Sequence, residues 1–484
     1  GLVILTVPLV LASCGRQSAE KPQVTVLIRM MDIQDRFFRG ELMAAAEAEL
    51  GVRINVVTFD RVEDIERLVQ HDLEAKQGRI ALVKTAQSEV APMVRRGLVM
   101  PLDEIVPAEK LAADLDEYVP AAVDFGTFEG RAYYIPRKLE CNVFLYLKSQ
   151  VAAAVAGWET LRPAIDALFK RQNGIGLPAG YTLEADPNEW DWYDLAVVAA
   201  YWSRTEGADG LTRGRLAHRG KDYSGTTFEL LTKLYQVNGD ADDFYRMTTV
   251  PALDVFEWES FYVLNGLYNP DMWHQQWSGG GIWKGFVAGQ VYAAFMHQID
   301  AFFIHGGSHP TMQGYLRDPG DMGLAIMPRG ASLELGEGGR AARLGRHASN
   351  FAGWWWGIPA STPDPDLSYR LARFITNREN HLKECARFGM LPIRKDVREH
   401  VSEFIAEPWM RNVFETGWAQ FEAGVVKPPA AARFDRMGAI WRKAWYDVVV
   451  RQHEGGKQPR VDREALREAL APYAEQIAEL RKGT

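Results

Sequence analysis

Several acidic side chains of this 484-residue chain are of the type that supports acid–base chemistry. Glycoside hydrolysis needs two carboxyl groups, one as the acid and the other as base or nucleophile. The candidates for such a pair are Glu140, Asp186, Glu189 and Asp191. Nothing in their spacing fixes the separation that a catalytic pair requires, so hydrolysis stays an alternative and is not the first expectation.

Other catalytic and metal-binding patterns are missing from the sequence. His297, His305 and His309 match no zinc-ligand spacing, and we expect structural roles for them. There is no Gly-x-Ser-x-Gly elbow and no His-Glu-x-x-His helix. The run Gly279-Gly280-Gly281 lacks the ending of a phosphate loop and is expected to mark a break. The sequence therefore predicts no metal and no cofactor.

Aromatic and polar residues together could bind a carbohydrate. A sugar offers apolar C–H faces, which stack on aromatic rings, and hydroxyls, which bond to planar polar groups. The chain contains 15 tryptophans. Most aromatic residues belong to protein cores, so this count alone does not decide between a core and a sugar site.

The first residues resemble the end of an export signal. An apolar run finishes in Leu11-Ala12-Ser13-Cys14, and small residues before a cysteine suit cleavage of a lipoprotein signal. As a helix the run would reach about 20 Å, short of the ~30 Å hydrocarbon core. We expect residues 1–14 to be a signal remnant with lipid on Cys14, and residues 15–23 a linker. The protein would then work in the periplasm or on the outer face of the cytoplasmic membrane, anchored by lipid alone.

Composition is that of a globular protein with two or three domains. Hydrophobic residues make up 47% and charged residues 24% of the chain. A net charge of -8 argues against a nucleic-acid surface, which needs a clustered basic face. Apart from Cys14, the cysteines are Cys141 and Cys385. We expect two buried free thiols, with a disulfide as the alternative.

Strands alternate with helices in the first hundred residues. Apolar patterns predict strands at 24–30, 52–59 and 80–83, and helices at 36–50, 62–75 and up to Arg96. This alternation predicts an α/β sheet with parallel strands, whose ligands bind beyond the carboxyl ends of the strands. Residues 31–34 and 84–88 would lie there.

The chain beyond residue 151 is expected to be mainly helical. Its predicted helices span 151–170, 192–202, 226–235 and 462–481. Residues 283–303 are expected to mix helix and strand, and residues 331–347 to form an exposed hairpin or loop.

Several short motifs occur in a specific order. They are Gly97–Asp103 (GLVMPLD), Gly130–Pro136 (GRAYYIP), Phe144–Lys148 (FLYLK), Phe286–Val291 (FVAGQV), Ala352–Pro359 (AGWWWGIP) and Phe374–Arg394 (FITNRE … GMLPIR). Together with the cysteine motif, they resemble the extracellular solute-binding proteins of ABC importers, specifically the family that includes maltose-binding protein.

The resemblance implies a type II periplasmic-binding-protein-like α/β fold of two lobes with the ligand cleft between them. The chain would cross between the lobes three times, near 139–143, 347–353 and 392–397. The N-terminal lobe would comprise 24–139 plus 354–394, and the C-terminal lobe 140–353 plus 395–484. The implied function is capture of a carbohydrate by cleft closure, without catalysis, by a monomer that delivers it to transporter permease subunits.

The resemblance also implies which residues contact the ligand. Glu140 matches a hinge glutamate that contacts sugar, although it could be only a solvated hinge charge. Trp441 lies where the family has a sugar-stacking tryptophan, and the rival interpretation is core packing with Trp445. The remaining candidates are Trp354, Trp356, Asp32, Gln34, Gln87, Ser88, Gln298, Asp300 and Trp190.

Three other functions stay open at this point. The same scaffold could bind a polyol, a peptide or a glycerophosphodiester. The chain could instead be a secreted glycosidase or lyase, or a two-lobed sensor without a transport role.

Overall fold

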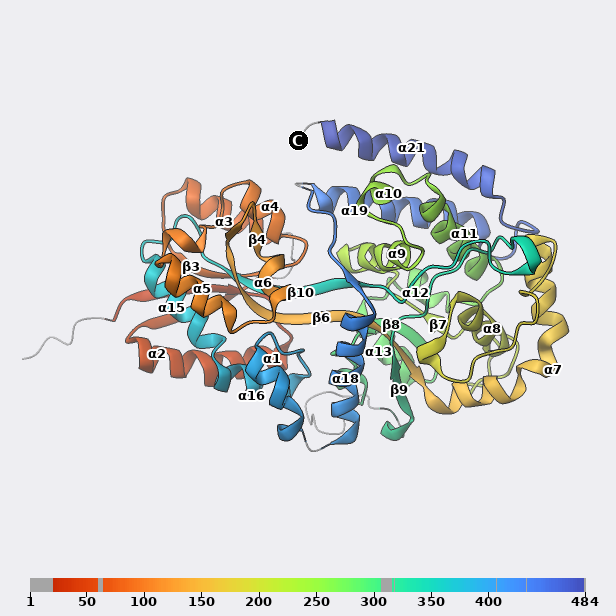
Figure 1. Cartoon of the computed structure of the whole chain (residues 1–484), viewed down its shortest axis with the longest axis horizontal. Helices are drawn as coiled ribbons and strands as arrows, with labels where there is room; N and C mark the ends of the chain where they lie inside the picture. The colour runs from red at the N-terminus through yellow and green to blue at the C-terminus, as the bar shows by residue number, and fades with distance from the viewer. Residues whose placement is uncertain are drawn as a thin grey trace, which may run out of the picture.

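The computed structural model describes residues 21–59, 64–305, 316, 318–405, 407–431 and 433–482. Cys14 lies outside these ranges, so its lipid remains a prediction. The described residues form two α/β lobes that lie end to end along the long axis of the molecule (Figure 1), which confirms the predicted two-lobed fold class. In the described part of the chain, no helix is both long enough and apolar enough to cross a membrane.

The first lobe is built on a mixed sheet in the order β2-β1-β3-β10-β6. β1 (Gln23–Ile28) pairs in parallel with β2 (Arg53–Thr58) and β3 (Ile80–Ala86), so the predicted parallel strands are confirmed. Helices α3 and α4 cover one face, and α2 and α16 cover the other (Figure 1). The remaining elements of this part of the fold are α1 (Asp32–Phe37), η1 (Phe38–Met43), α2 (Ala44–Leu50), α3 (Asp64–Glu74), α4 (Val90–Arg95), η2 (Leu102–Glu104), α5 (Ala108–Asp116), α6 (Pro120–Phe125), β4 (Thr127–Phe128), β5 (Arg131–Ala132), α15 (Pro365–Ile375), α16 (Arg378–Phe388) and α17 (Lys395–His400).

The second lobe continues the same sheet through β8 and β7, with β9 as a further partner of β6. Helices surround these short strands. They and the remaining strands are α7 (Lys148–Asn173), η3 (Pro187–Glu189), α8 (Trp192–Trp202), β7 (Leu216–Ala217), α9 (Ser224–Gln236), α10 (Ala241–Arg246), α11 (Val250–Leu264), α12 (Asp271–His274), α13 (Gly279–Val287), β8 (Ala293–His297), α14 (Asp300–His305), η4 (Pro319–Asp321), β9 (Met322–Ala325), η5 (Glu337–Gly339), η6 (Val401–Phe404), α18 (Pro408–Ala423), β11 (Val425–Val426), α19 (Phe434–Ala444), η7 (Trp445–Val450), α20 (Arg451–His453) and α21 (Arg463–Lys482).

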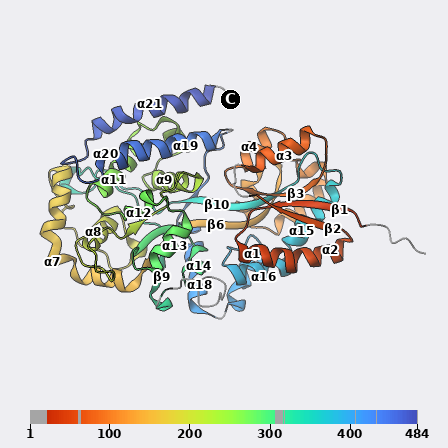
Figure 2. The same ribbon diagram turned by 180° about the vertical axis from the view of Figure 1, so that it is seen from behind.

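Two long strands join the lobes. β6 (Tyr134–Leu147) pairs with β10 (Ser349–Gly357) as far as Cys141, and from Asn142 onward it pairs with β8. β6 and β10 run side by side between the lobes in both views (Figure 1, Figure 2). The chain passes between the lobes again after α17, and α18 then packs on β6 and β9. The exact lobe boundaries stay a prediction.

Two local expectations were wrong. The first helix begins at Asp32 and not at Arg36. The π-helical turn η1 shifts the spacing of the apolar residues, so the 3.6-residue period does not reveal the first turn of the helix. The glycine run at 279–281 does not break the chain but opens α13. A Cβ on Gly281 would lie only 2.6 Å from the Trp277 ring, so a glycine there lets this ring pack against the helix.

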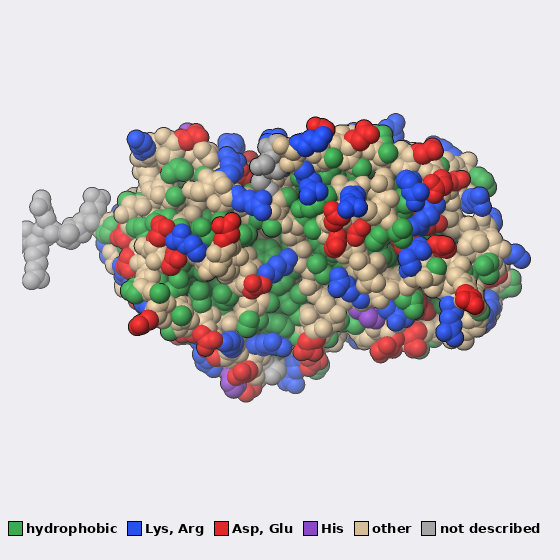
Figure 3. All heavy atoms as spheres, turned by 45° about the horizontal axis from the view of Figure 1, so that its top comes forward, with side chains coloured by type: hydrophobic (Ala, Val, Ile, Leu, Met, Phe, Trp, Pro, Cys, Tyr) green, Lys and Arg blue, Asp and Glu red, His purple; other side chains and the backbone are tan. Residues whose placement is uncertain are grey.

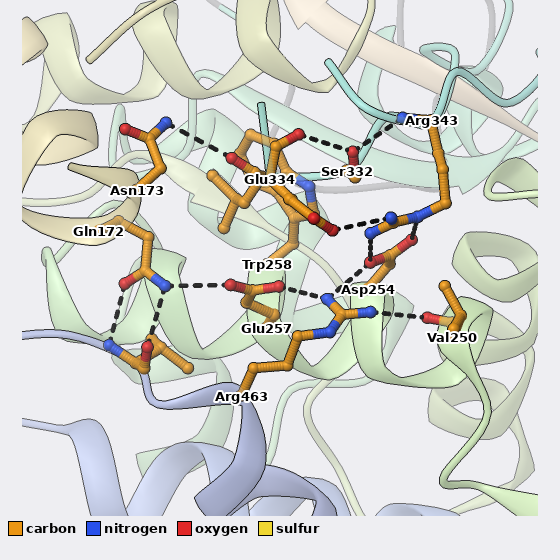
Figure 4. A network of polar contacts seen from close by, with 12 residues as sticks. Gln172, Asn173, Val250, Asp254, Glu257, Trp258, Ser332, Glu334, Arg343 and Arg463 are labelled. Atoms are coloured by element: carbon orange, nitrogen blue, oxygen red, sulfur yellow. Dashed lines mark hydrogen bonds and ion pairs between the residues drawn. The ribbon is translucent and has the colours of Figure 1, made fainter. Parts of the chain in front are cut away.

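Ion pairs fix the outer elements of the second lobe. Asp254 of α11 accepts two hydrogen bonds from Arg343, at 2.8 and 3.0 Å, and pairs with Arg463 at 2.7 Å. Glu257, one turn further on, binds Arg463 and Gln172 (Figure 4). This network holds α21, α7 and the 331–347 segment on α11. That segment is a hairpin, as predicted, with bridges Ala331–Leu344 and Leu335–Ala341.

Charges of both signs are interspersed on the surface. On the face drawn in Figure 3, Lys and Arg side chains alternate with Asp and Glu, and hydrophobic side chains gather over the first lobe and near its junction with the second. Among the residues that the structure describes, no group of His, Cys, Asp and Glu is arranged to hold a metal ion.

Candidate functional site between the lobes

Polar side chains line one face of the strand that joins the lobes. Lys138, Glu140 and Asn142 occupy alternate positions of β6, so they point to the same side. All of them are buried. On β10, Trp354 lies opposite Lys138, and Ala352 lies opposite Glu140. We call the group of side chains assembled here the inter-lobe cluster. Its buried members are Lys84, Lys138, Glu140, Asn142, Arg219, Glu229, Asp300 and Asn350, and its half-buried members are His297 and Trp354.

The first-lobe side of the cluster is cationic. Lys84 comes from the end of β3, and its Nζ donates to the carbonyl of Arg29 at 2.6 Å. The same ammonium lies 4.1 Å from the centre of the half-buried Trp354 ring, a cation–π contact. Lys138 Nζ donates to Glu140 Oε1 at 2.5 Å. Burial acts to raise the pKa of Glu140, but the Lys138 ammonium holds it below its ordinary value.

The second-lobe side is organised around one arginine. Arg219 donates to Glu229 of α9 at 2.5 Å and to Asp300 of α14 at 3.2 Å. Asn142 Nδ2 donates to the other oxygen of Glu229 at 3.2 Å, and Trp283 Nε1 donates to Asp300 at 3.2 Å. The second-lobe side therefore joins Arg219, which lies outside the helices and strands, to residues of β6, α9, α13 and α14 that are far apart in the sequence.

Burial controls the charge of these carboxyl groups. It raises the pKa of Glu229 to about 7 and that of Asp300 to about 6, because one arginine serves both groups. Burial also lowers the pKa of His297 to about 3, so this imidazole is neutral at pH 7. His297 Nδ1 lies 3.8 Å from Glu140 Oε2 and links the two halves of the cluster.

Several buried amide atoms have no partner among the described residues. They are Asn142 Oδ1, Gln298 Nε2, Gln34 Nε2 and both amide atoms of Asn350. Asn350 lies beside this face, where its backbone N–H bonds to Thr232 one turn after Glu229. An unsatisfied buried polar atom costs about 1–3 kcal/mol. Since these atoms include both donors and acceptors, they suit a partner that both accepts and donates.

Comparison with known proteins identifies the family. Residues 41–412, more than half of the chain, match the family described as bacterial extracellular solute-binding protein. The chain belongs to this family. Its members are binding proteins, and membership places the chain outside the cytoplasm. No protein with a curated description matches the sequence at a significant level.

Solved structures share the fold at low sequence identity. The maltose-bound MalE3 of T. maritima has a TM-score of 0.67 and 16% identity, over 95% of this chain and 99% of that chain. An ABC substrate-binding protein from Listeria monocytogenes, in complex with cycloalternan, has a TM-score of 0.66 and 13% identity, over 96% and 100%. A solute-binding protein from Agrobacterium radiobacter, in complex with ribitol, has a TM-score of 0.64 and 15% identity, over 94% and 99%.

Part of the predicted site lies together in this solute-binding fold. Glu140, Asp300 and Trp354 belong to the inter-lobe cluster. Gln298 is buried beside it, where its Oε1 accepts from the Cys141 N–H at 3.0 Å, and Gln87 Oε1 faces the Gly353 N–H at 3.5 Å. Their contact with a ligand stays a prediction.

Three predicted contacts come from the ends of the first-lobe strands. Gln34 lies in α1 and is buried, and Ser88 is buried in the turn before α4. Asp32 begins α1, and its side chain lies outside what the structure describes. A ligand contact by these residues also remains a prediction.

Three tryptophans predicted to touch the ligand lie instead in the core. Trp441 is 0% exposed, stacks on Phe244 with ring centres 5.3 Å apart, and bonds to its carbonyl. Trp190 is equally buried and donates to Glu184, while Trp356 packs on Phe38. The helix that carries Trp441 turns this ring inward onto α10 and α11, so it has no surface for a ligand. At these three positions the structure has a core side chain where the sequence analysis expected a ligand contact, and only the expectation for Trp441 came from the family resemblance.

Sequence reasoning missed several members of the cluster. They are Lys138, Asn142, Arg219, Glu229, His297 and Asn350, whereas Lys84 belongs to the segment 84–88 that was expected at the ligand-binding edge of the sheet. For β6 a signal existed, since polar residues at every second position of an apolar strand mark one polar face. The meeting of Arg219 with Asp300 has no such signal, because it depends on how α14 packs.

Proposed function

We propose that this protein captures a carbohydrate in the inter-lobe cluster and delivers it to an ABC importer. The observation that carries the proposal is the set of unpartnered amide donors and acceptors of Asn142 and Asn350, which lie on the same face of β6 and β10 as the half-buried Trp354. A hydroxyl both donates and accepts, so a polyhydroxylated solute matches them, while its C–H face suits an aromatic ring. The maltose and cycloalternan complexes of the structural neighbours support this solute class.

A polyol is the second candidate. The structural neighbour that binds ribitol has the same fold, and a linear polyol offers the same hydroxyl chemistry without a ring face. Dependence of binding on Trp354 separates the two, since ring stacking contributes only for a cyclic sugar.

Ligand capture is proposed to occur without catalysis and by closure of the lobes. Contacts from both lobes can form together only when the lobes are close, so the ligand favours that state. The two lobes already touch at other points of their junction. Lys427 pairs with Asp124, and the Phe302 ring lies against Gly389. We further propose that the protein acts as a monomer, with its transporter reading the closed form.

A thermal-shift screen across neutral saccharides, polyols and short peptides tests the solute class. A ligand at 100 times its Kd should add about 2.7 kcal/mol of stability. The best ligand is then incubated with the protein and the mixture is assayed for released reducing sugar. Stabilisation only by peptides would contradict the carbohydrate proposal, and sugar release at substoichiometric protein would show an enzyme.

The lipid anchor is proposed on Cys14. The carrying observation is Leu11-Ala12-Ser13-Cys14 after an apolar run. Cys14→Ala should leave the protein unprocessed or soluble after membrane fractionation. Mass spectrometry of the wild type that finds an unmodified N-terminal cysteine would contradict the anchor.

A further inference from the structure

Among Lys84 and the charged groups that act on it, cations outnumber carboxylates. β3 supplies Lys84, and β6 supplies Arg137 and Lys138, all of them buried. Two of these cations have a carboxylate of their own: Arg137 pairs with Glu384, and Lys138 pairs with Glu140. Among the side chains that the structure describes, no carboxylate forms an ion pair with Lys84.

The ammonium of Lys84 is held in place but not neutralised. Lys84 is 2% exposed, and it donates to the Arg29 carbonyl and faces the Trp354 ring. An ammonium has three donors, and a buried charge without a counter-charge is strongly unfavourable. Burial, followed by the charges of Lys138 and Arg137, lowers the pKa of Lys84 well below its ordinary value.

The other charges of the cluster do not supply the missing anion. Glu140 is bonded to Lys138, and both Glu229 and Asp300 are bonded to Arg219 on the second-lobe side. The position beside Lys84 and Trp354 therefore favours an anion that comes from outside the chain.

We propose that the captured solute is an acidic saccharide, whose carboxylate, or a phosphate in its place, binds Lys84. The inference rests on the proposed carbohydrate function and narrows its solute class. In this arrangement the Lys84 ammonium donates charge-assisted hydrogen bonds to the anionic group, and the Trp354 ring lies next to that group. The unpartnered amides near Asn142 and Asn350 would then serve hydroxyls further along the solute.

Matched neutral and acidic ligands test the proposal. Calorimetric titration compares D-galactose and D-glucose and their dimers with D-galacturonate and D-glucuronate and their dimers, and with D-glucose 6-phosphate. We expect the acidic member of at least one pair to bind about tenfold tighter or more. The uronate and phosphate arms show which anionic group the site prefers, and inorganic phosphate alone shows whether the sugar is needed.

Variants assign the preference to one residue. Lys84→Met should abolish the preference for the acid, measured as the ratio of the Kd values of the neutral and the acidic ligand in the same variant, and Lys84→Gln provides a second uncharged variant that keeps a donor for the Arg29 carbonyl. Lys383→Met is the control, because this lysine is exposed on α16 and paired with Glu379. It should bind like the wild type.

Each remaining outcome overturns a distinct part of the account. Neutral saccharides that bind as tightly as the acids would refute the acidic solute and leave the carbohydrate function standing. An acid preference that persists in both Lys84 variants would refute the role of Lys84. If no saccharide of either class binds, the proposed function and this inference fail together.

Discussion

Replacing Glu229 by Gln should stabilise the protein above neutral pH and leave it almost unchanged at pH 4.5. The Glu229 side chain is 1% exposed, and its carboxyl group is bonded to Arg219 and Asn142. Arg219 also serves Asp300, so the positive charge is shared between two buried acids. As a result, burial outweighs the arginine, and the pKa of Glu229 rises from 4.5 to about 7.

The sign and size of the effect follow from this pKa. Between pH 4.5 and 7 the folded protein binds a proton at Glu229 that the unfolded chain does not, so the free energy of unfolding falls as pH rises. Each pKa unit is worth about 1.4 kcal/mol, and the full effect is therefore about 3 kcal/mol. Like the protonated acid, glutamine is uncharged and has a single carbonyl oxygen, which can accept from Arg219 in place of the carboxylate. The variant should not show this loss.

Urea unfolding at pH 4.5, 6 and 8 measures the effect. The difference between Glu229→Gln and wild type should be close to zero at pH 4.5 and approach ~3 kcal/mol in favour of the variant at pH 8. Glu337→Gln, at an exposed position in η5, is the control and should show no such trend. A variant that is less stable than wild type at pH 8 would refute the reasoning, since Arg219 would then outweigh burial.

Further predictions concern the hydrophobic core, the ion pairs of α21 and the unpartnered amides. Trp441→Ala should cost about 3–5 kcal/mol of stability in urea unfolding, because it empties a stacked aromatic site; a loss below 1 kcal/mol would contradict a core role. Arg463→Ala should cost about 1–3 kcal/mol and increase hydrogen exchange in α21, whereas unchanged exchange would show that the ion pairs do not hold this helix. Asn350→Leu should leave the ligand-free protein as stable or more stable, while Asn269→Leu, whose Nδ2 and Oδ1 each have a hydrogen-bond partner, should cost about 1–3 kcal/mol. Equal losses in the two asparagine variants would show that Asn350 has partners.

Local sequence patterns predicted much of the fold. The alternation of strands and helices up to Arg96 indicated the parallel sheet, and the helix at 192–202 was predicted with both its ends. The capping box of Asp191 and Asp194 explains why that helix start is so well defined. Patterns failed where local geometry departs from the ideal period, as at the π-helical turn of Phe38–Met43.

The site was harder to predict from the sequence than the fold. Amphipathic spacing shows that Trp441 faces inward, but it does not show whether inward means the core or the cleft. The alternating polar residues of β6 could have been read from the sequence. By contrast, Arg219 meets Asp300 only because α14 follows β8 at the junction of the lobes, and a contact across 81 residues has no local signature.

The central claim, that the solute binds in the inter-lobe cluster, is tested most directly by two tryptophan variants. Trp354 and Trp418 are both half-buried, with a cation over the ring at 4.1 and 4.0 Å, but only Trp354 belongs to the cluster. Calorimetric titration uses the saccharide with the largest thermal shift. The account predicts that Trp354→Ala weakens binding by about 1–3 kcal/mol, while Trp418→Ala binds like the wild type. Wild-type affinity in a folded Trp354→Ala variant would contradict it.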